Sequence, residues 1–244
     1  MTKLRKKATE PTQPNVNVEK AVLMDFRGRT IVLRVDETSL DGTTLVSDIA
    51  FLLQRDVRPI VVAPQAELAR AFVGVMNRTG DAAVGLRGAD AGMIPAAGHA
   101  IGSVQTRLLE TLTRSGYVPV IEPTAIGLRG DDIQLPVDDV ARAIAEATEA
   151  SRIVFFDPNG GVVDAATQQL LGELTPAEAL AIADSGTLAP ALAAAIRAAA
   201  LGVRGGVDAA QIIDGRIAHA TIVELVTARH LGTQIAGSVL IVTP

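Results

Sequence analysis

Short runs of aliphatic residues alternate along the chain with longer segments in which apolar residues recur at helical spacing. An unbroken aliphatic run indicates a strand buried on both faces, and alternation with helices is typical of a parallel sheet. The pattern therefore predicts an α/β fold. The six predicted strands cover residues 30–35, 59–63, 117–121, 153–156, 209–213 and 239–242.

Four segments between these strands carry helix signals. They cover residues 45–56, 137–151, 174–186 and 190–202. The third has the clearest limits, because Thr175 and Glu178 can form a capping box, Pro176 suits the first helical position and Gly186 suits the end. The first helix joins two strands into a β-α-β unit. The glycine-rich stretch 84–103 reads as loop and hairpin instead.

The composition favours one compact body with two lobes. The chain has 244 residues, 48% of them hydrophobic but only 2% aromatic, so Ala, Val, Leu and Ile must fill the core. No apolar run is long enough to span a bilayer. We expect a flexible tail over residues 1–17, an N-terminal lobe over 18–130 and a C-terminal lobe over 131–244, joined by one continuous sheet.

Charge and residue usage narrow the chemistry. The absence of Cys excludes disulfides, thiol nucleophiles and thiolate metal sites. His99, His219 and His230 match no metal spacing or catalytic triad, and we interpret them as surface or packing residues. The net charge of −5 argues against nucleic acid. No apolar stretch follows the basic N-terminus, as a secretory signal would require, so we predict a cytoplasmic protein with no membrane partner. Because the histidines match no metal spacing, we also predict no bound metal.

Two segments combine polar residues with a position at the end of an element. VDDV, residues 137–140, puts two carboxylates at a helix start, where they either serve chemistry or interact with the helix dipole. FFDPNGGVVD, residues 155–164, follows a strand at the end where open α/β sheets bind ligands, although it would form a turn in any case. GLRGAD, residues 85–90, is a weaker anion-binding pattern because no helix follows it.

The C-terminal third, from LTPAEALAIADSGT to IIDGRIAHATIVELVTARHLGTQI, resembles the acetylglutamate kinases of the amino acid kinase family. FRGRTIVLRVDE, LVSDIAFLLQRDVRPIVVAP, GYVPVIEP and VDDVARAIAEATEASRIVFFDPNGGV extend the resemblance over residues 26–235. It implies a three-layer αβα sandwich with a mainly parallel central sheet. It also implies phosphorylation of N-acetylglutamate by ATP in arginine biosynthesis, homodimers or hexamers, and inhibition of some members by arginine.

The chain departs from this family at its phosphate-binding loops. A lysine and a glycine pair end the family's first strand, whereas this chain has Arg34, Val35, Asp36 and Glu37. Two carboxylates in place of glycines would repel a triphosphate and block close backbone approach. The three-glycine loop after the second strand is replaced by APQA, residues 63–66.

Other family cations are also missing. Ala89 stands where a loop lysine is expected, and a gapless placement puts the second catalytic lysine at Ala195 and a glycine pair at residues 190–191. The segment 65–83 is too short for the element that carries the substrate-binding arginine. Residues 229–230, Arg and His, replace a Glu-Gly pair, which argues against arginine feedback.

Two family features remain. Asp138 matches an aspartate that organises the family's lysines, with Arg34 as the surviving cation. The loop after the fourth predicted strand resembles part of the nucleotide wall, and its candidate residues are Asp157, Asn159, Gly160 and Gly161.

These losses predict a catalytically inactive homologue with a regulatory, ligand-binding or oligomer-assembly role. Removal of one electrostatic contact to a transition state typically costs about 3 kcal/mol, and several contacts are missing. The alternative is an active kinase in which Arg34 and Asp138 are catalytic and Mg-ATP is the cofactor. A third hypothesis is a structural subunit that forms a mixed oligomer with an active kinase paralogue.

Overall fold

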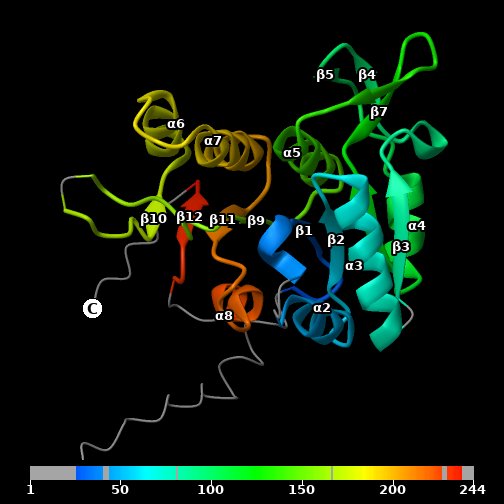
Figure 1. Cartoon of the computed structure of the whole chain (residues 1–244), viewed down its shortest axis with the longest axis horizontal. Helices are drawn as coiled ribbons and strands as arrows, with labels where there is room; N and C mark the ends of the chain where they lie inside the picture. The colour runs from blue at the N-terminus through cyan, green and yellow to red at the C-terminus, as the bar shows by residue number, and fades with distance from the viewer. Residues whose placement is uncertain (1–25, 41–43, 81, 166, 227–229, 238–244) are drawn as a thin grey trace, which may run out of the picture.

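The computed structural model of the chain describes residues 26–40, 44–80, 82–165, 167–226 and 230–237. Its middle layer is an eight-stranded sheet with the order β10-β12-β11-β9-β1-β2-β6-β3 (Figure 1). Every neighbouring pair is parallel except β11 and β12. The strands are β1 Thr30–Arg34, β2 Arg58–Val62, β3 Ala83–Arg87, β6 Val118–Glu122, β9 Arg152–Phe156, β10 Glu173–Leu174, β11 Ala209–Ile213 and β12 Thr233–Ala236.

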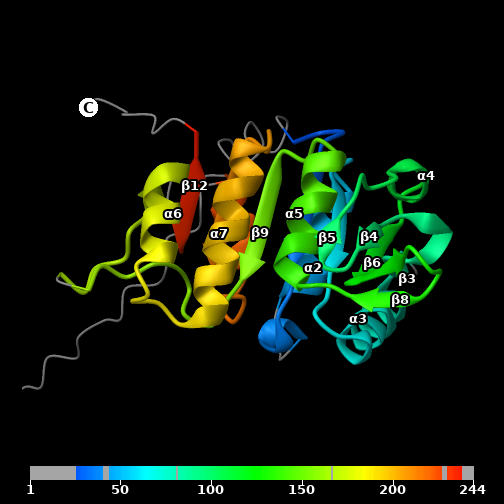
Figure 2. The same cartoon turned by 90° about the horizontal axis from the view of Figure 1, so that it is seen from above.

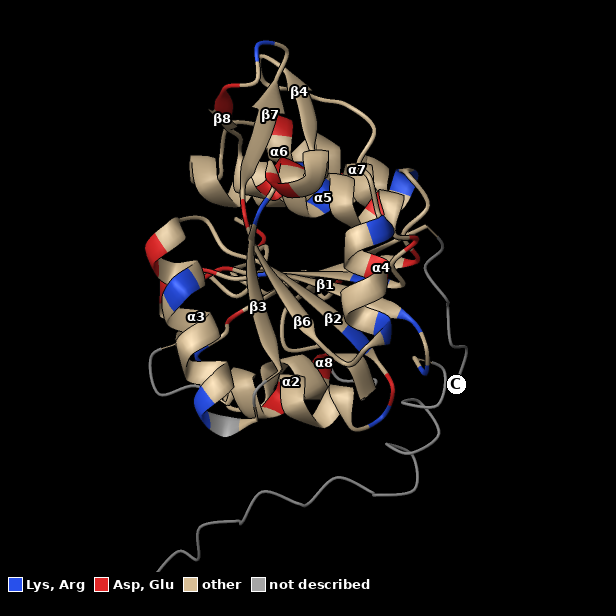
Figure 3. Ribbon diagram, turned by 90° about the vertical axis from the view of Figure 1, so that its right-hand side faces the viewer, with Lys and Arg blue, Asp and Glu red and all other residues tan. Residues whose placement is uncertain are grey.

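Helices cover both faces of the sheet, as Figures 2 and 3 show. One face carries α4 Arg107–Arg114, α5 Val137–Ala147, α6 Pro176–Asp184 and α7 Pro190–Arg204. The other carries α2 Leu45–Leu53, α3 Ala66–Thr79 and α8 Ala220–Val226. Each face has its own hydrophobic cluster. The predicted three-layer αβα sandwich with a mainly parallel central sheet is confirmed.

The alanine-rich α7 can lie close to its neighbours because its buried side chains are small. Ala195, Ala199 and Ala200 are fully buried. A Cβ atom at Gly202 would lie only 2.8 Å from Cδ1 of Ile153 on β9. A nearly aromatic-free core is thus filled by close approach of helix and sheet instead of large side chains.

A small second sheet extends beyond the carboxyl ends of β3 and β6 (Figure 1). Its order is β5-β4-β7-β8, with β4 Pro95–Ala97, β5 Ala100–Ile101, β7 Thr124–Gly127 and β8 Asp132–Gln134. The hairpin expected within residues 84–103 is therefore present. The start of that stretch is not loop, however, since β3 pairs with β6 along its whole length.

Five of the six predicted strands are confirmed within one residue at each end. The sixth, at 239–242, lies outside the described residues, as does the predicted tail at 1–17. All four predicted helices are present, although the first ends at Leu53 and the chain turns at Asp56, which has a φ of 59°. Helices α3, α4 and α8 and strands β3, β7, β8, β10 and β12 were not predicted. The lobe boundary near residue 131 stays a prediction.

The predicted capping box is confirmed: the Thr175 hydroxyl accepts a hydrogen bond from Glu178 N, and the Glu178 carboxylate accepts one from Thr175 N. Within the described ranges, no helix combines the length and hydrophobicity that crossing a bilayer requires.

Candidate functional site

The middle of the sheet contains a topological switch point. From β1 the chain continues to β2 on one side, and after β6 it returns to form β9 on the other side of β1. Ligands of open α/β sheets bind at the carboxyl ends of strands beside such a point. Arg34 ends β1, Asp157 directly follows β9 and Asp138 lies in the first turn of α5. The structure thus brings these three predicted residues to one edge.

Arg34 and Asp138 form a largely buried ion pair. Nε of Arg34 lies 2.5 Å from Oδ1 of Asp138, and the two side chains are 9% and 13% exposed. Nη1 of Arg34 also donates a hydrogen bond of 2.8 Å to the Phe156 carbonyl. The guanidinium carbon is 5.7 Å from the centre of the Phe155 ring. The surviving family cation is therefore held by groups of the chain itself.

The surroundings of Asp138 disfavour its charged form. Burial raises the pKa of Asp138 above its ordinary value, Arg34 opposes this shift, and the nearby Asp139 and Asp157 add to it. Asp138 lies in the first turn of α5, as the predicted interaction with the helix dipole requires, but it does not cap the helix, because the N-cap residue is Pro136 and no side chain caps that end. The Asp138 carboxylate instead holds Arg34.

The loop after β9 is a fixed turn. Oδ1 of Asp157 accepts hydrogen bonds of 2.8 Å from both N and Nδ2 of Asn159. Gly160 and Gly161 have φ values of 70° and 135°, which favour glycine. A Cβ at Gly161 would lie 2.7 Å from Oγ1 of Thr233 on β12. The turn is thus explained by packing, and a nucleotide-wall role for these four residues remains a proposal.

An acidic turn follows β1 where the family resemblance places glycines. Oδ1 of Asp36 accepts hydrogen bonds from Thr38 N, Thr38 Oγ1 and Ser39 Oγ. Its Oδ2 atom is buried and has no hydrogen-bond partner in the described part of the chain. Glu37 begins a short 3-10 helix, Glu37–Leu40. The Asp36 carboxylate thus closes this turn, and Glu37 is exposed beside the switch point.

Sequence reasoning missed one cation at this edge. Arg216 follows β11, and its Nη2 atom lies 2.7 Å from Oδ2 of Asp214 and donates a hydrogen bond of 2.7 Å to the Pro158 carbonyl. The hydrogen bond from Arg216 lowers the pKa of Asp214. The segment DGR directly after the predicted strand 209–213 was a usable signal, because it occupies the same kind of strand end as Asp157.

The positions assigned to missing family lysines offer no cation. Ala195 is fully buried inside α7, and the exposed residues in the first turn of that helix, Pro190 and Ala191, carry no charge. Ala89 is buried. A Cβ at the neighbouring Gly88 would lie 2.0 Å from the Thr124 carbonyl oxygen, so the GLRGAD glycine serves close packing against β7.

The histidines lie away from this edge or pair with carboxylates. Nδ1 of His219 is 2.6 Å from Oδ1 of the buried Asp48. His230 lies 3.1 Å from both Glu224 and Glu173, and His99 is exposed. Their predicted packing or surface roles are confirmed. Among the described residues, no group of three or more His, Asp and Glu side chains is arranged to hold a metal ion. Arg229 lies outside the described residues.

Fold and site together define an αβα protein with paired charged side chains at the switch point of a parallel sheet. The model of the amino acid kinase family matches residues 63–214. The chain belongs to this family.

Curated relatives agree with this assignment. The chain is 32% identical over 225 residues to acetylglutamate kinase of Gluconacetobacter diazotrophicus, covering 84% of this chain and 70% of the relative. It is 32% identical over 204 residues to acetylglutamate kinase of Stutzerimonas stutzeri, covering 75% and 67%. The predicted acetylglutamate-kinase-like character is thus confirmed.

Solved structures show the same fold at low identity. N-acetylglutamate synthase from Neisseria gonorrhoeae, complexed with coenzyme A and N-acetylglutamate, matches with a TM-score of 0.76 and 18% identity. That match covers 92% of this chain, which spans only 63% of the synthase chain. Carbamate kinase from Giardia lamblia, bound to AMP-PNP, matches with a TM-score of 0.59 and 13% identity, covering 86% of this chain and 99% of that one.

Proposed function

We propose that this chain is an inactive, acetylglutamate-kinase-like protein with a regulatory, ligand-binding or oligomer-assembly role. The observation that carries the proposal is the state of Arg34, which is buried and bonded to Asp138 and to the Phe156 carbonyl. Phosphoryl transfer depends on cations and backbone N–H groups that stabilise the transferred phosphate. Here Arg34 is already paired with Asp138, and the other cation described at this edge, Arg216, is paired with Asp214.

Releasing Arg34 to bind phosphate would be costly. Breaking a buried ion pair by removing one partner typically costs about 3–5 kcal/mol, because the other charge stays buried. A triphosphate would also meet the carboxylates of Asp36 and Glu37. The residues present therefore do not fit Mg-ATP, and no step of a reaction is assigned to it.

The proposal also covers the pathway, the cellular compartment and the oligomeric state of the protein. The names of the relatives, acetylglutamate kinases, support a role beside arginine biosynthesis in the cytoplasm. The family resemblance supports a homo-oligomer, a dimer or a hexamer. A mixed oligomer with an active kinase paralogue would let an inactive chain act through its partner. Neither nucleic acid nor membrane is proposed as a partner, because the net charge is −5 and no described helix is suited to a bilayer.

One observation favours the alternative of an active kinase that uses Mg-ATP and a carboxylate substrate such as N-acetylglutamate. A cation and an aspartate remain paired at the switch point, so Asp138 would position Arg34 as a substitute for lysine. The nucleotide would then lie against the loop formed by Asp157, Asn159, Gly160 and Gly161.

ADP release separates the two functions. The full-length chain is incubated with Mg-ATP and N-acetylglutamate, and Arg34→Lys, which restores the family cation, is tested in parallel. The proposal expects no ADP above a protein-free control from either chain, since the introduced lysine would still face Asp36 and Glu37. Turnover that is lost in a folded Arg34→Ala variant would establish the alternative. Co-purification of the inactive chain with a kinase paralogue would support the assembly role.

A further inference from the structure

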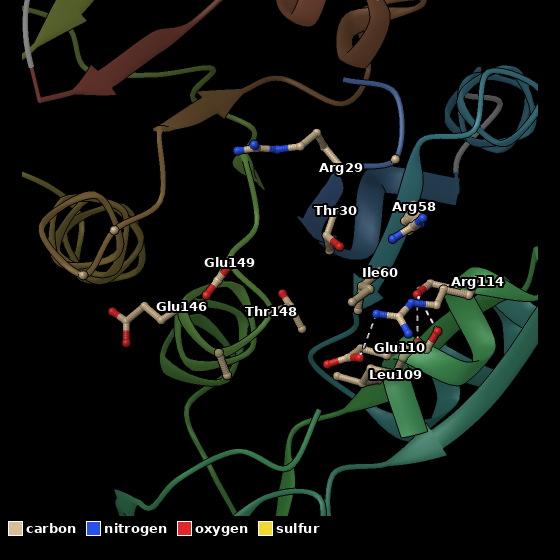
Figure 4. A pocket seen from close by; sticks show the side chains of 15 residues that line it. Arg29, Thr30, Arg58, Ile60, Leu109, Glu110, Arg114, Glu146, Thr148 and Glu149 are labelled. Atoms are coloured by element: carbon tan, nitrogen blue, oxygen red, sulfur yellow. Dashed lines mark hydrogen bonds and ion pairs between the residues drawn. The ribbon is translucent and has the colours of Figure 1, made fainter. Parts of the chain in front are cut away.

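A polar cavity lies at the opposite edge of the main sheet, where β1 and β2 begin (Figure 4). Its volume is about 800 Å³, which is within the usual range for small-molecule sites. Its walls include the first residues of β1 and β2 and the carboxyl ends of α4, α5 and α7. None of the residues predicted from the sequence as catalytic or nucleotide-binding lines it.

Arg58 places an unpaired cation in this cavity. Its Nε atom is buried and has no hydrogen-bond partner, and no carboxylate in the described part of the chain lies within ion-pair distance of its guanidinium. The other two arginines of the lining are paired: Nη2 of Arg29 lies 3.0 Å from Asp208, and Nη2 of Arg114 lies 3.2 Å from Glu110. A guanidinium with a desolvated Nε is suited to bidentate binding of a carboxylate.

The facing wall has the opposite electrostatic character. Glu149 is exposed, and the described residues provide no ion-pair partner for it, whereas the neighbouring Glu146 is held by Arg142 at 2.9 Å. The carboxyl ends of α5 and α7, with the negative ends of their dipoles, line this side, whereas the carboxyl end of α4 lies on the side of Arg58. Figure 4 shows Arg58 and Glu149 on opposite sides of the space, with Thr30 and Thr148 between them.

We propose that this cavity binds a free amino acid as a zwitterion, with its carboxylate at Arg58 and its ammonium group toward Glu149 and the helix carbonyls. A simple anion would satisfy Arg58 but would meet three negative helix ends. A simple cation would meet an unpaired, partly desolvated guanidinium. A molecule with both charges satisfies both walls. The cavity site is independent of the function proposed for the other edge, because it shares no residue with that edge.

Calorimetric titration of the full-length chain tests the site. The probes are L-alanine, L-glutamate and L-lysine, which differ in side-chain charge, together with propionate and ethylamine, which each carry one of the two charges of L-alanine. At least one amino acid should bind about tenfold more tightly than either singly charged probe. Absence of saturation with all three amino acids at millimolar concentration, or equal binding of propionate, overturns the proposal.

Variants locate the bound probe. Arg58→Gln should weaken binding by about tenfold or more, and Arg58→Lys, which keeps the charge but not the planar fork, should weaken it less. Glu149→Asn removes the facing charge with a residue that tolerates the φ of 49° found there, and should weaken binding severalfold.

The matched control is Arg216→Gln, which removes an exposed arginine from the other edge and should leave amino acid binding unchanged. Circular dichroism confirms that each variant is folded before titration. Unchanged binding in folded Arg58→Gln and Glu149→Asn, or loss of binding in Arg216→Gln alone, would place the ligand elsewhere and overturn the assignment.

Discussion

The two edges of the main sheet differ in how their charges are used. At the carboxyl edge, Arg34 is bound by Asp138 and Arg216 is bound by Asp214. At the amino edge, Arg58 and Glu149 face a cavity without ion-pair partners in the described part of the chain. The cations at the edge that carries the family motifs are thus already paired, whereas the other edge presents a cation and a carboxylate that are unpaired within the described residues. The edge that resembles the family's active site and the edge proposed here to bind a ligand are therefore different parts of the sheet.

The largest expected effect concerns the buried pair at the carboxyl edge. Arg34→Met leaves Asp138 buried without its cation and should lower the free energy of unfolding by about 3–5 kcal/mol. Urea denaturation measures the loss. The double variant Arg34→Met/Asp138→Leu removes both charges and should recover most of it. A loss below about 1 kcal/mol in the single variant would show that the pair behaves like a surface pair.

The wall of α7 beside the cavity at the amino edge gives a second test. Gly202→Ala puts a methyl group 2.8 Å from Cδ1 of Ile153 and should lower the free energy of unfolding by about 1–3 kcal/mol. The matched control is Gly74→Ala on α3, where the nearest heavy atom to the new Cβ is 3.8 Å away. That change should stabilise the fold by up to about 1 kcal/mol. Equal effects of the two substitutions would contradict close packing of α7.

The pH dependence of stability should differ between the edges. Because burial raises the folded-state pKa of Asp138, its contribution to stability is present below its ordinary value of 3.8 and is lost as the pH rises through the raised pKa. Relative to Asp138→Asn, the wild-type chain should therefore lose unfolding free energy across that interval. Arg58→Gln should show no such difference from wild type. A difference of the opposite sign for Asp138 would mean that pairing with Arg34 outweighs burial.

The smallest effect is expected for the exposed pair at the amino edge. Arg29 and Asp208 are 3.0 Å apart, with side chains 48% and 56% exposed. A double-mutant cycle with Arg29→Gln and Asp208→Asn should give a coupling energy of about 0.2–1 kcal/mol that decreases in high salt. Coupling as large as that of Arg34 with Asp138 would remove the energetic distinction between the edges.

Strands were predictable because they are buried on both faces. The run TIVLR of β1 has four buried residues in a row, and such runs leave a clear signal without any partner being known. Helix α3 was also predictable, because Ala69, Phe72 and Met76 recur at helical spacing, but the segment 65–83 was considered only for the family element that it lacks. Strand β3 has alternating burial and a glycine in its middle, so its turn-like composition hid its pairing with β6.

The candidate site was predictable in part, from the ends of strands and from the family resemblance. The rule that ligands bind at strand ends identified Asp157, and applied to DGR it would also have identified Arg216, whereas Arg34 and Asp138 came from the family resemblance. The mutual neutralisation of Arg34 and Asp138 depends on contacts between residues 104 positions apart, which spacing along the chain does not reveal. The cavity at the amino edge was missed for the same reason, because the ends of five elements form it.

Calorimetric titration of the folded full-length chain with Mg-ATP tests the central claim most directly. Our account predicts no saturable heat, because Arg34 is already paired and Asp36 and Glu37 oppose a triphosphate. Saturable binding near one nucleotide per chain, weakened in a folded Arg34→Gln variant, would contradict it and restore the carboxyl edge as a nucleotide site.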